Sequence, residues 1–196
     1  MAHAPYFVAC NWSDIDALRL AVAASAAHCG DFHVLVNNTA SDDRHDFLDV
    51  TPAYFDAKVA INVKVAFFAA QAVIAGMLRR GGGSIINLGS TGWKIKVAGY
   101  PVYATSKSAV NGLTRSLARE YGKYNIRVNT LTPGWVMTAR QLAVCVDAES
   151  ERELDSNQCL PGRIKGRDVA SMALFLGAQD SRMMTAQEFV VDAGWT

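Results

Sequence analysis

The chain has 196 residues, of which 51% are hydrophobic and 19% are charged. A chain of this length can bury roughly 70% of the surface that its unfolded form exposes, so it can fold as about one domain without a disulfide or a metal. The composition excludes an intrinsically disordered chain. The formal net charge of +1 gives no electrostatic reason to expect nucleic acid or an anionic membrane as a partner.

No segment has the pattern of a membrane anchor, a targeting signal or a metal site. The longest apolar stretch, residues 65–78, is shorter than the ~20 residues of a membrane span. The first ten residues lack Lys and Arg, so no signal peptide is expected. The four histidines have no metal-ligand spacing. The wide spacing of the cysteines predicts buried, reduced thiols in a cytoplasmic protein: Cys10, Cys29, Cys145 and Cys159.

The N-terminal half of the chain alternates short apolar runs with longer helical patterns. Residues 6–10 and 33–37 are predicted strands. Residues 14–28 predict an Ala-rich helix that begins at a capping residue. Residues 51–80 predict a long helix, because Thr51 can cap it and a proline follows at the first helical position.

The C-terminal half continues this alternation. Strands are predicted at residues 84–88, 126–131 and 188–192, and helices at residues 100–121 and 167–177. Apolar strands separated by helices predict an α/β fold in which helices cover both faces of a parallel sheet. Ligands of such sheets bind beyond the C-terminal ends of the strands, which here carry Asn37-Asn38, Gly89-Ser90 and Thr132-Pro133-Gly134.

One pair of side chains at helical spacing can carry acid–base chemistry. Tyr103 and Lys107 are four residues apart, so they share one face of a helix. A Lys ammonium beside a phenol favours the phenolate, which predicts a Tyr103 pKa lowered from about 10 toward neutrality. Tyr103 would then serve as a general acid or base at neutral pH.

A second set repeats the same intervals in the chain: Ser41, Tyr54 and Lys58. The local sequence favours the set that contains Ser90. Ser90 directly follows a predicted strand and a glycine, and Tyr103 is followed by small residues that let a flat ligand approach the helix. Tyr54 lies in the first turn of its helix, where packing is the simpler interpretation.

Three further features have both a structural and a functional interpretation. Gly81-Gly82-Gly83 follows a helix and precedes a strand, the reverse of a phosphate-binding turn, which predicts a helix stop. Asn62 lies mid-helix, where its amide either bonds to a backbone group or marks a kink that aims it at the site. Trp93 and Trp135 follow strand ends, where they either belong to the core or line a pocket.

In their order along the chain, these residues resemble the short-chain dehydrogenase/reductase family, from about residue 6 to the C-terminus. The resemblance implies a single domain over residues 1–196, with a Rossmann-like parallel sheet and a substrate lid at about residues 139–161. It rests on matches in register: Leu35-Val36-Asn37-Asn38, Asn62, Ile85-Ile86-Asn87 leading to Ser90, Tyr103 with Lys107, Pro133-Gly134 with Thr138, and the ending Val191-Asp192-Ala193-Gly194-Trp195.

More narrowly, the chain looks like the aldose 1-dehydrogenases of this family, which act on D-xylose, L-arabinose, L-rhamnose and similar sugars. The implied reaction is the NAD(P)-dependent oxidation of an aldose to its lactone, with hydride passing from C1 to the nicotinamide. The residues behind this are Asp42-Asp43-Arg44-His45, the Trp of Ser90-Thr91-Gly92-Trp93, and Asn157-Gln158-Cys159-Leu160-Pro161-Gly162-Arg163.

The resemblance implies catalytic roles for Asn62, Ser90, Tyr103 and Lys107. Tyr103 would take the proton from the substrate hydroxyl, and Ser90 would hydrogen-bond the same oxygen. Lys107 would lower the pKa of Tyr103 and hold the nicotinamide ribose. Asn62 would anchor a water in the proton path.

The resemblance also implies which residues surround the ligands. Residues 51–80 and 100–121 resemble the helices through which the family forms homo-oligomers, implying a dimer or a tetramer. The substrate, a sugar or another alcohol or carbonyl compound, would contact Ser90, Trp93, Tyr103 and Gln141. NAD or NADP would contact Asn11, Asn37, Asn38, Thr39, Tyr103, Lys107, Pro133, Gly134, Val136 and Thr138.

The sequence departs from the family pattern in three places. The usual N-terminal strand, Gly-rich turn and helix are absent, which implies an N-terminally truncated fold without the pyrophosphate turn. Asn11 stands where an adenine-contacting Asp is usual, and Thr39-Ala40 stands where Ala-Gly is usual. Without the missing strands, residues 33–37 would expose an apolar edge, so we expect residues 6–10 or another chain to pair with it.

Two functions therefore remain open from the sequence. The first is an oxidoreductase of the short-chain type. The second is a truncated, catalytically inactive paralogue that cannot bind a dinucleotide and acts, if at all, through oligomerisation. A hydrolase is a remote third, because Ser90 lacks a G-x-S-x-G turn and no His is placed to be its base.

Overall fold

The computed structural model describes residues 5–144 and 146–196. Within these residues the sheet has the strand order β1-β2-β3-β4, and each neighbouring pair is parallel. The predicted α/β fold with a parallel sheet is therefore confirmed. The strands are β1 (Val34–Asn37), β2 (Gly83–Leu88), β3 (Ile126–Pro133) and β4 (Glu188–Val191).

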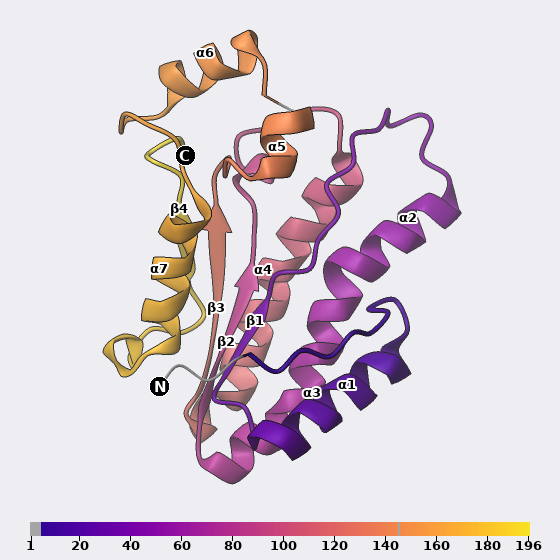
Figure 1. Cartoon of the computed structure of the whole chain (residues 1–196), viewed down its shortest axis with the longest axis vertical. Helices are drawn as coiled ribbons and strands as arrows, with labels where there is room; N and C mark the ends of the chain where they lie inside the picture. The colour runs from indigo at the N-terminus through magenta and orange to yellow at the C-terminus, as the bar shows by residue number, and fades with distance from the viewer. Residues whose placement is uncertain (1–4, 145) are drawn as a thin grey trace.

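Helices cover both faces of this sheet (Figure 1). On one side lie α1 (Ile15–Cys29), α3 (Val65–Arg80) and α4 (Pro101–Tyr121), and on the other lies α7 (Gly166–Gly177). The alternation of side chains along β2 explains both layers. Ile85 packs with α3 and α4, whereas Ile86 packs with Leu176 of α7. Because successive side chains of a strand point to opposite faces, one short strand contributes to both cores.

The remaining elements are short. Figure 1 shows two helices of the predicted lid segment, α5 and α6, above the C-terminal ends of the strands. These elements are α2 (Pro52–Val59), the π-helical turn η1 (Ala60–Lys64), the 3-10 turns η2 (Thr91–Trp93), η3 (Gly122–Tyr124) and η4 (Gln179–Ser181), α5 (Ala139–Val144) and α6 (Ala148–Asn157).

The helix predicted at residues 51–80 forms as a continuous segment with a π-helical turn in its middle. The Thr51 side chain accepts a hydrogen bond from the Tyr54 N–H and so caps α2, as predicted. α3 ends where Gly81 takes up a left-handed conformation, with a φ of 78°. A non-glycine residue adopts this conformation with difficulty, which confirms the helix stop at Gly81.

This segment, Pro52–Arg80, is 29 residues long and contains an 18-residue window with a mean hydropathy of 1.7, so it is apolar enough to span a membrane by length and composition. Packing against the sheet accounts for this hydropathy without a membrane. Val73 and Met77 are buried against Ile85 and Val128 of the sheet. The segment is the main core helix of its face.

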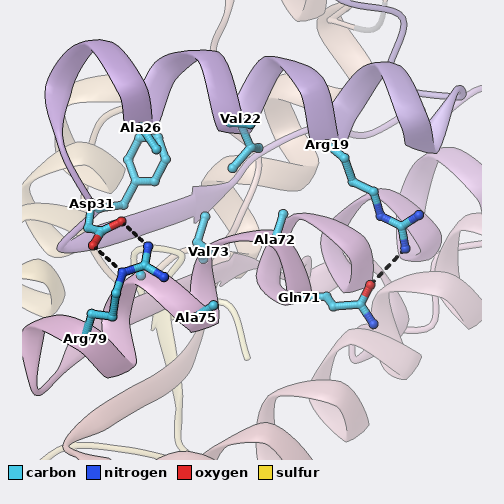
Figure 2. A pocket seen from close by; sticks show the side chains of 12 residues that line it. Arg19, Val22, Ala26, Asp31, Gln71, Ala72, Val73, Ala75 and Arg79 are labelled. Atoms are coloured by element: carbon cyan, nitrogen blue, oxygen red, sulfur yellow. Dashed lines mark hydrogen bonds and ion pairs between the residues drawn. The ribbon is translucent and has the colours of Figure 1, made fainter.

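α1 packs along α3 and leaves a surface groove of about 490 Å³ between the two helices (Figure 2). Val22 and Val73 lie along the groove. Charged contacts join the helices at its two ends. Arg79 forms an ion pair with Asp31 at 2.6 Å, and the Arg19 guanidinium donates to the Gln71 side-chain oxygen at 3.0 Å. None of the predicted site residues lines this groove.

The strand predicted at residues 6–10 is absent from the described structure. Those residues have no regular secondary structure, and β1 pairs with β2 alone among the described strands. The expectation that residues 6–10 pair with β1 is wrong. Tyr6 stacks instead on His28 of α1, with ring centroids 4.1 Å apart. An apolar run becomes a strand only where a neighbour completes its hydrogen-bond ladder, and here Val34 and Val36 stay 36% and 45% exposed.

The cysteines differ in part from their prediction. Cys10, Cys29 and Cys159 are free thiols, as expected for reduced residues. Cys29 and Cys159 are exposed and Cys10 is half-buried, so the predicted burial is wrong for these three. Cys145 lies outside the described residues.

Candidate active site

Ser90, Tyr103 and Lys107 come together beyond the C-terminal end of β2. Ser90 caps the turn η2, because its Oγ accepts a hydrogen bond from the Gly92 N–H at 3.1 Å. Tyr103 lies in the first turn of α4 and lines the same cavity as Ser90, which lowers the pKa of the phenol. The Lys107 Nζ lies 5.7 Å from the centroid of the Tyr103 ring. The structure thus joins a hydroxyl, a phenol and an ammonium from two separate elements.

Lys107 is a buried cation, with only 2% of the residue exposed. Its Nζ donates to the Leu88 carbonyl oxygen at 2.7 Å, which ties α4 to the end of β2. Burial lowers the pKa of Lys107 to about 8, because the charged form loses its hydration. The charge of Asp42 acts in the opposite direction.

The pKa of Tyr103 differs from the value that the sequence predicts. Burial raises the pKa of Tyr103 to about 12, the hydrogen bond from Ser90 lowers it, and the charge of Asp42 raises it further. The prediction that Lys107 brings this pKa toward neutrality is therefore wrong for the structure as it stands. The physical reason is that the ammonium bonds to the Leu88 carbonyl rather than to the phenol oxygen, while burial penalises the phenolate.

The rival set at Ser41 is arranged differently. The Tyr54 hydroxyl lies 3.0 Å from His45 Nδ1, and Lys58 forms an ion pair with Asp43. The Lys58 Nζ also donates to the Ser41 Oγ at 2.8 Å. These contacts hold the loop between β1 and α2 onto the side of α2. The set is therefore a loop anchor, and Tyr54 does not line the cavity beside Ser90.

Asn62 lies in the π-helical turn η1, where it is 2% exposed. Its side-chain oxygen accepts from the Ser41 N–H at 2.9 Å, and its Nδ2 donates to the Ser41 carbonyl at 3.0 Å. Both ends of the amide are thus bonded to a backbone, which agrees with the structural interpretation of this residue. A π-helical turn is also the kind of local irregularity that the functional interpretation expects.

A cavity of about 420 Å³ opens beside Ser90 and Tyr103. Arg44, Glu153 and Trp195 also line it. Glu153 belongs to the predicted lid and Trp195 to the C-terminal motif of the resemblance, but neither was predicted as a site residue. The sequence-predicted residues among its walls are Asn38, Ser90, Tyr103, Pro133, Gly134, Val136, Thr138 and Gln141.

Several predicted residues lie outside the cavity walls. Asn11 is exposed before α1, and its side chain accepts from the Ser13 N–H. Asn37 bonds to the Asn87 side chain at 2.8 Å inside the sheet. Trp93 also lies off the wall, and its indole N–H is buried without a partner, whereas Trp135 lines the cavity. The others are Thr39, Asn62 and Lys107, of which Lys107 is buried beneath Tyr103.

Side chains from two segments far apart in the sequence meet in the wall of the cavity. Arg140 of α5 forms an ion pair with Asp42 at 2.6 Å. Gln141 donates to the other Asp42 oxygen at 3.1 Å and accepts from the Trp135 indole N–H at 2.9 Å. Asp42 therefore connects the loop after β1 to the segment that follows β3. The resulting wall is polar and offers both donors and acceptors.

The donors at this site fit the nicotinamide end of a dinucleotide. Lys107 uses one of its three N–H donors on Leu88, which leaves donors for ribose hydroxyls. Gly134 keeps the wall close-packed, since a Cβ there would lie 2.8 Å from the Asp192 Cβ. No stretch of the sequence matches G-x-G-x-x-G, so the residues present fit the nicotinamide and its ribose rather than the pyrophosphate.

The fold and this site define a class: an α/β protein with acid–base groups beyond the C-terminal ends of parallel strands. A family model described as enoyl-(acyl carrier protein) reductase matches residues 1–196. The chain is 41% identical over 191 residues to the D-xylose 1-dehydrogenase of Caulobacter vibrioides, covering 97% of this chain and 75% of the relative. It is 38% identical to a Rhizobium meliloti protein named "probable galactose dehydrogenase", with the same coverage. The chain belongs to the short-chain dehydrogenase/reductase family, whose members are NAD(P)-dependent oxidoreductases.

Solved structures agree with this membership. A gluconate 5-dehydrogenase of Burkholderia cenocepacia, in complex with NADP and tartrate, has a TM-score of 0.88 and 28% identity, over 94% of this chain and 72% of that one. A blue fluorescent protein from a metagenomic library, in complex with NADPH, has a TM-score of 0.87 and 36% identity, over 95% and 74%. This chain thus spans about three quarters of the length of these relatives.

Proposed function

We propose that this chain oxidises a sugar hydroxyl, from aldose to lactone, with NAD or NADP as hydride acceptor and Tyr103 as general base. The observation that carries the proposal is that Ser90 and Tyr103 line one polar cavity, with Lys107 buried behind the phenol. The sugar specificity is supported by the names of two relatives, a D-xylose and a galactose dehydrogenase.

In this mechanism the chain's own residues bind the hydroxyl and move its proton. Ser90 hydrogen-bonds the substrate oxygen, and Tyr103 takes the proton from it. The nicotinamide, when bound, supplies the acceptor for the hydride. Lys107, Pro133, Gly134, Val136 and Thr138 would hold the nicotinamide and its ribose.

The pKa of Tyr103, about 12, leaves the phenol neutral at pH 7, so oxidation requires a positive charge beside it. We assign this role to Lys107, whose Nζ lies 5.7 Å from the centroid of the Tyr103 ring, although in the structure as it stands it bonds to Leu88 and does not lower this pKa. Its pKa of about 8 leaves most of the ammonium protonated at pH 7. In the reverse direction a neutral phenol is ready to donate its proton to a carbonyl oxygen.

The substrate region of the proposal is a lid at about residues 139–161. Its support is the set of contacts that Arg140 and Gln141 make with Asp42, and the place of Glu153 in the cavity wall. A sugar presents hydroxyl groups that can both donate and accept. Carboxylate, guanidinium and amide groups around one cavity can bind such hydroxyls.

The proposal also covers the protein's localisation and its assembly into oligomers. We place it in the cytoplasm and expect a homo-oligomer, either a dimer or a tetramer, that forms through α2, α3 and α4. The exposed side chains of Phe55 and Phe67, 41% and 46% accessible, support an interface there. A small molecule is the expected ligand, with no role for nucleic acid or membrane.

A second candidate function is the inactive paralogue, and the unpaired edge of β1 is the observation that favours it. Titration calorimetry with NAD and NADP separates the two functions. Binding followed by nicotinamide reduction with one of a panel of aldoses supports the enzyme. A purified chain that binds neither dinucleotide supports the paralogue.

A further inference from the structure

The loop between β1 and α2 reaches the start of α4, the helix that carries Tyr103. The Arg44 guanidinium donates to the Ala98 carbonyl oxygen at 2.8 Å and lies 4.1 Å from the centroid of the Tyr100 ring. The His45 N–H donates to the Gly99 carbonyl oxygen at 2.8 Å. These three contacts fix consecutive residues just before the first turn of α4.

His45 also caps this helix. Tyr100, at the N-cap position of α4, makes no side-chain capping hydrogen bond. The Val102 N–H instead donates to His45 Nε2, at 3.5 Å. Because an N–H only donates, Nε2 must accept and the ring proton must sit on Nδ1. His45 thus satisfies one of the free N–H groups of the first turn from a position far away in the sequence.

The other ring nitrogen of His45, Nδ1, also has contacts. His45 Nδ1 lies 3.0 Å from the Asp43 carbonyl oxygen and 3.0 Å from the Tyr54 hydroxyl. Asn62 holds the same loop through the backbone of Ser41. The set Ser41, Tyr54 and Lys58 therefore supports the helix that carries Tyr103 and Lys107.

The contacts of Arg44 continue toward the reacting groups. The Tyr100 ring meets the Tyr103 ring edge to face, with centroids 5.3 Å apart. The Tyr100 hydroxyl lies against Gly92, where a Cβ would overlap it, in the turn that Ser90 caps. Arg44 thus presses on a ring that lies between Tyr103 and the turn of Ser90.

We propose that Arg44 and His45 are positioning residues for Tyr103, holding the start of α4 so that the phenol stays beside Ser90 in the cavity wall. This rests on the proposed function, in which Tyr103 is the general base. Misplacement of a reacting group by about 1 Å can cost on the order of 100-fold in rate. Loss of either contact should therefore reduce kcat, and loss of the His45 contact should reduce kcat much more than it changes KM.

Two pairs of variants test the proposal in the full chain. His45→Leu removes the acceptor for Val102, whereas His45→Gln keeps an acceptor at the position of Nε2. Arg44→Met removes the cation and donor, whereas Arg44→Lys keeps both. Arg44 is exposed, so Arg44→Met should fold even if His45→Leu does not. His28→Leu, on the far end of α1, is the matched control.

The first readout is amide hydrogen exchange over residues 99–106, which needs neither cofactor nor activity. We expect exchange there to become about fivefold faster in His45→Leu and Arg44→Met, roughly the effect of losing a helix cap. The glutamine, lysine and His28 variants should match the wild type. Unchanged exchange in both disruptive variants would overturn the proposal.

The second readout is how the kinetic effect of each variant divides between kcat and KM. We expect kcat with an aldose to fall on the order of 10- to 100-fold in the disruptive variants. For His45→Leu, whose residue does not line the cavity, KM should stay within about twofold and His45→Gln should recover kcat. Faster exchange with an unchanged kcat would overturn the positioning role. If the wild type has no turnover, the proposed function fails, and the exchange data still decide whether Arg44 and His45 hold the helix.

Discussion

The Lys107 ammonium donates to the Leu88 carbonyl oxygen at 2.7 Å, while the phenol of its helical neighbour Tyr103 lies beside Ser90 in the cavity wall. The two side chains share a face of α4, yet each is directed to a different residue at the end of β2. Their pKa values consequently move apart: burial raises that of Tyr103 to about 12 and lowers that of Lys107 to about 8.

Lys107→Met should stabilise the fold at neutral pH while abolishing turnover. Lys107 has a folded pKa of about 8 and an ordinary value of 10.5, so below pH 8 both states hold the proton and the fold bears a buried charge. This cost is about 3 kcal/mol and disappears as the pH rises from 8 to 10.5. Urea unfolding should show a more stable variant at pH 7 and a gap that closes toward pH 10.5. A variant less stable than the wild type at pH 7 would contradict this.

Tyr103→Phe should abolish turnover, and Tyr54→Phe should leave it within a few-fold of the wild type. Removal of a general base typically lowers kcat on the order of 100- to 10,000-fold. The Tyr54 hydroxyl contacts His45 and does not line the cavity. His45 keeps its contacts with Asp43 and Val102, so the loss of the hydroxyl reaches Tyr103 only indirectly. Steady-state kinetics with an aldose and both dinucleotides measure the effect. The opposite ranking of the two variants would reverse the choice between the two Ser–Tyr–Lys sets.

Asp42→Asn should lower the pKa of Tyr103 and move the pH profile of kcat/KM to lower pH. The reason is that the negative charge of Asp42 disfavours the phenolate. Asp43→Asn is the matched control, because Asp43 is a neighbouring carboxylate paired with Lys58 and does not act on the pKa of Tyr103. Equal displacement of the profile by both variants would show a general charge effect rather than the contact described here.

Gly134→Ala should destabilise the protein by about 1–3 kcal/mol, the usual cost of forcing a methyl group into a packed core. A Cβ on Gly134 would lie 2.8 Å from the Asp192 Cβ, and backbone atoms cannot easily yield there. Gly112→Ala, on α4, is the control, since no atom lies within 4 Å of its Cβ position. It should stabilise the helix by about 0.5–1 kcal/mol. Thermal unfolding of the two variants gives the comparison.

Most helices and the sheet were predictable because local signals and the tertiary fold agree. Thr51 caps α2 and Gly81 ends α3, as their side chains and backbone preferences require. The strand predicted at residues 6–10 does not form, because an apolar run alone does not supply a partner strand. The π-helical turn at Asn62 was visible only as a polar residue in an apolar helix, without its geometry.

The candidate site was predictable in its residues but not in its electrostatics. The spacing of Tyr103 and Lys107 indicates a shared helix face, but the degree of burial and the position of Leu88 decide both pKa values. The contact between Asp42 and Arg140 joins residues 98 positions apart, which no local pattern could show. Trp93 was expected at the substrate, yet Trp135 lines the cavity wall, and Trp93 lies off it with its indole N–H buried.

The central claim is that this chain binds a nicotinamide dinucleotide at the Ser90–Tyr103–Lys107 site. Titration calorimetry of NAD and NADP into the purified chain, with Lys107→Met as the paired variant, tests it most directly. The account predicts saturable binding of at least one dinucleotide to the wild type, and binding weakened by at least tenfold in the stable Lys107→Met protein. No detectable binding to the wild type, or equal binding by the variant, would contradict it.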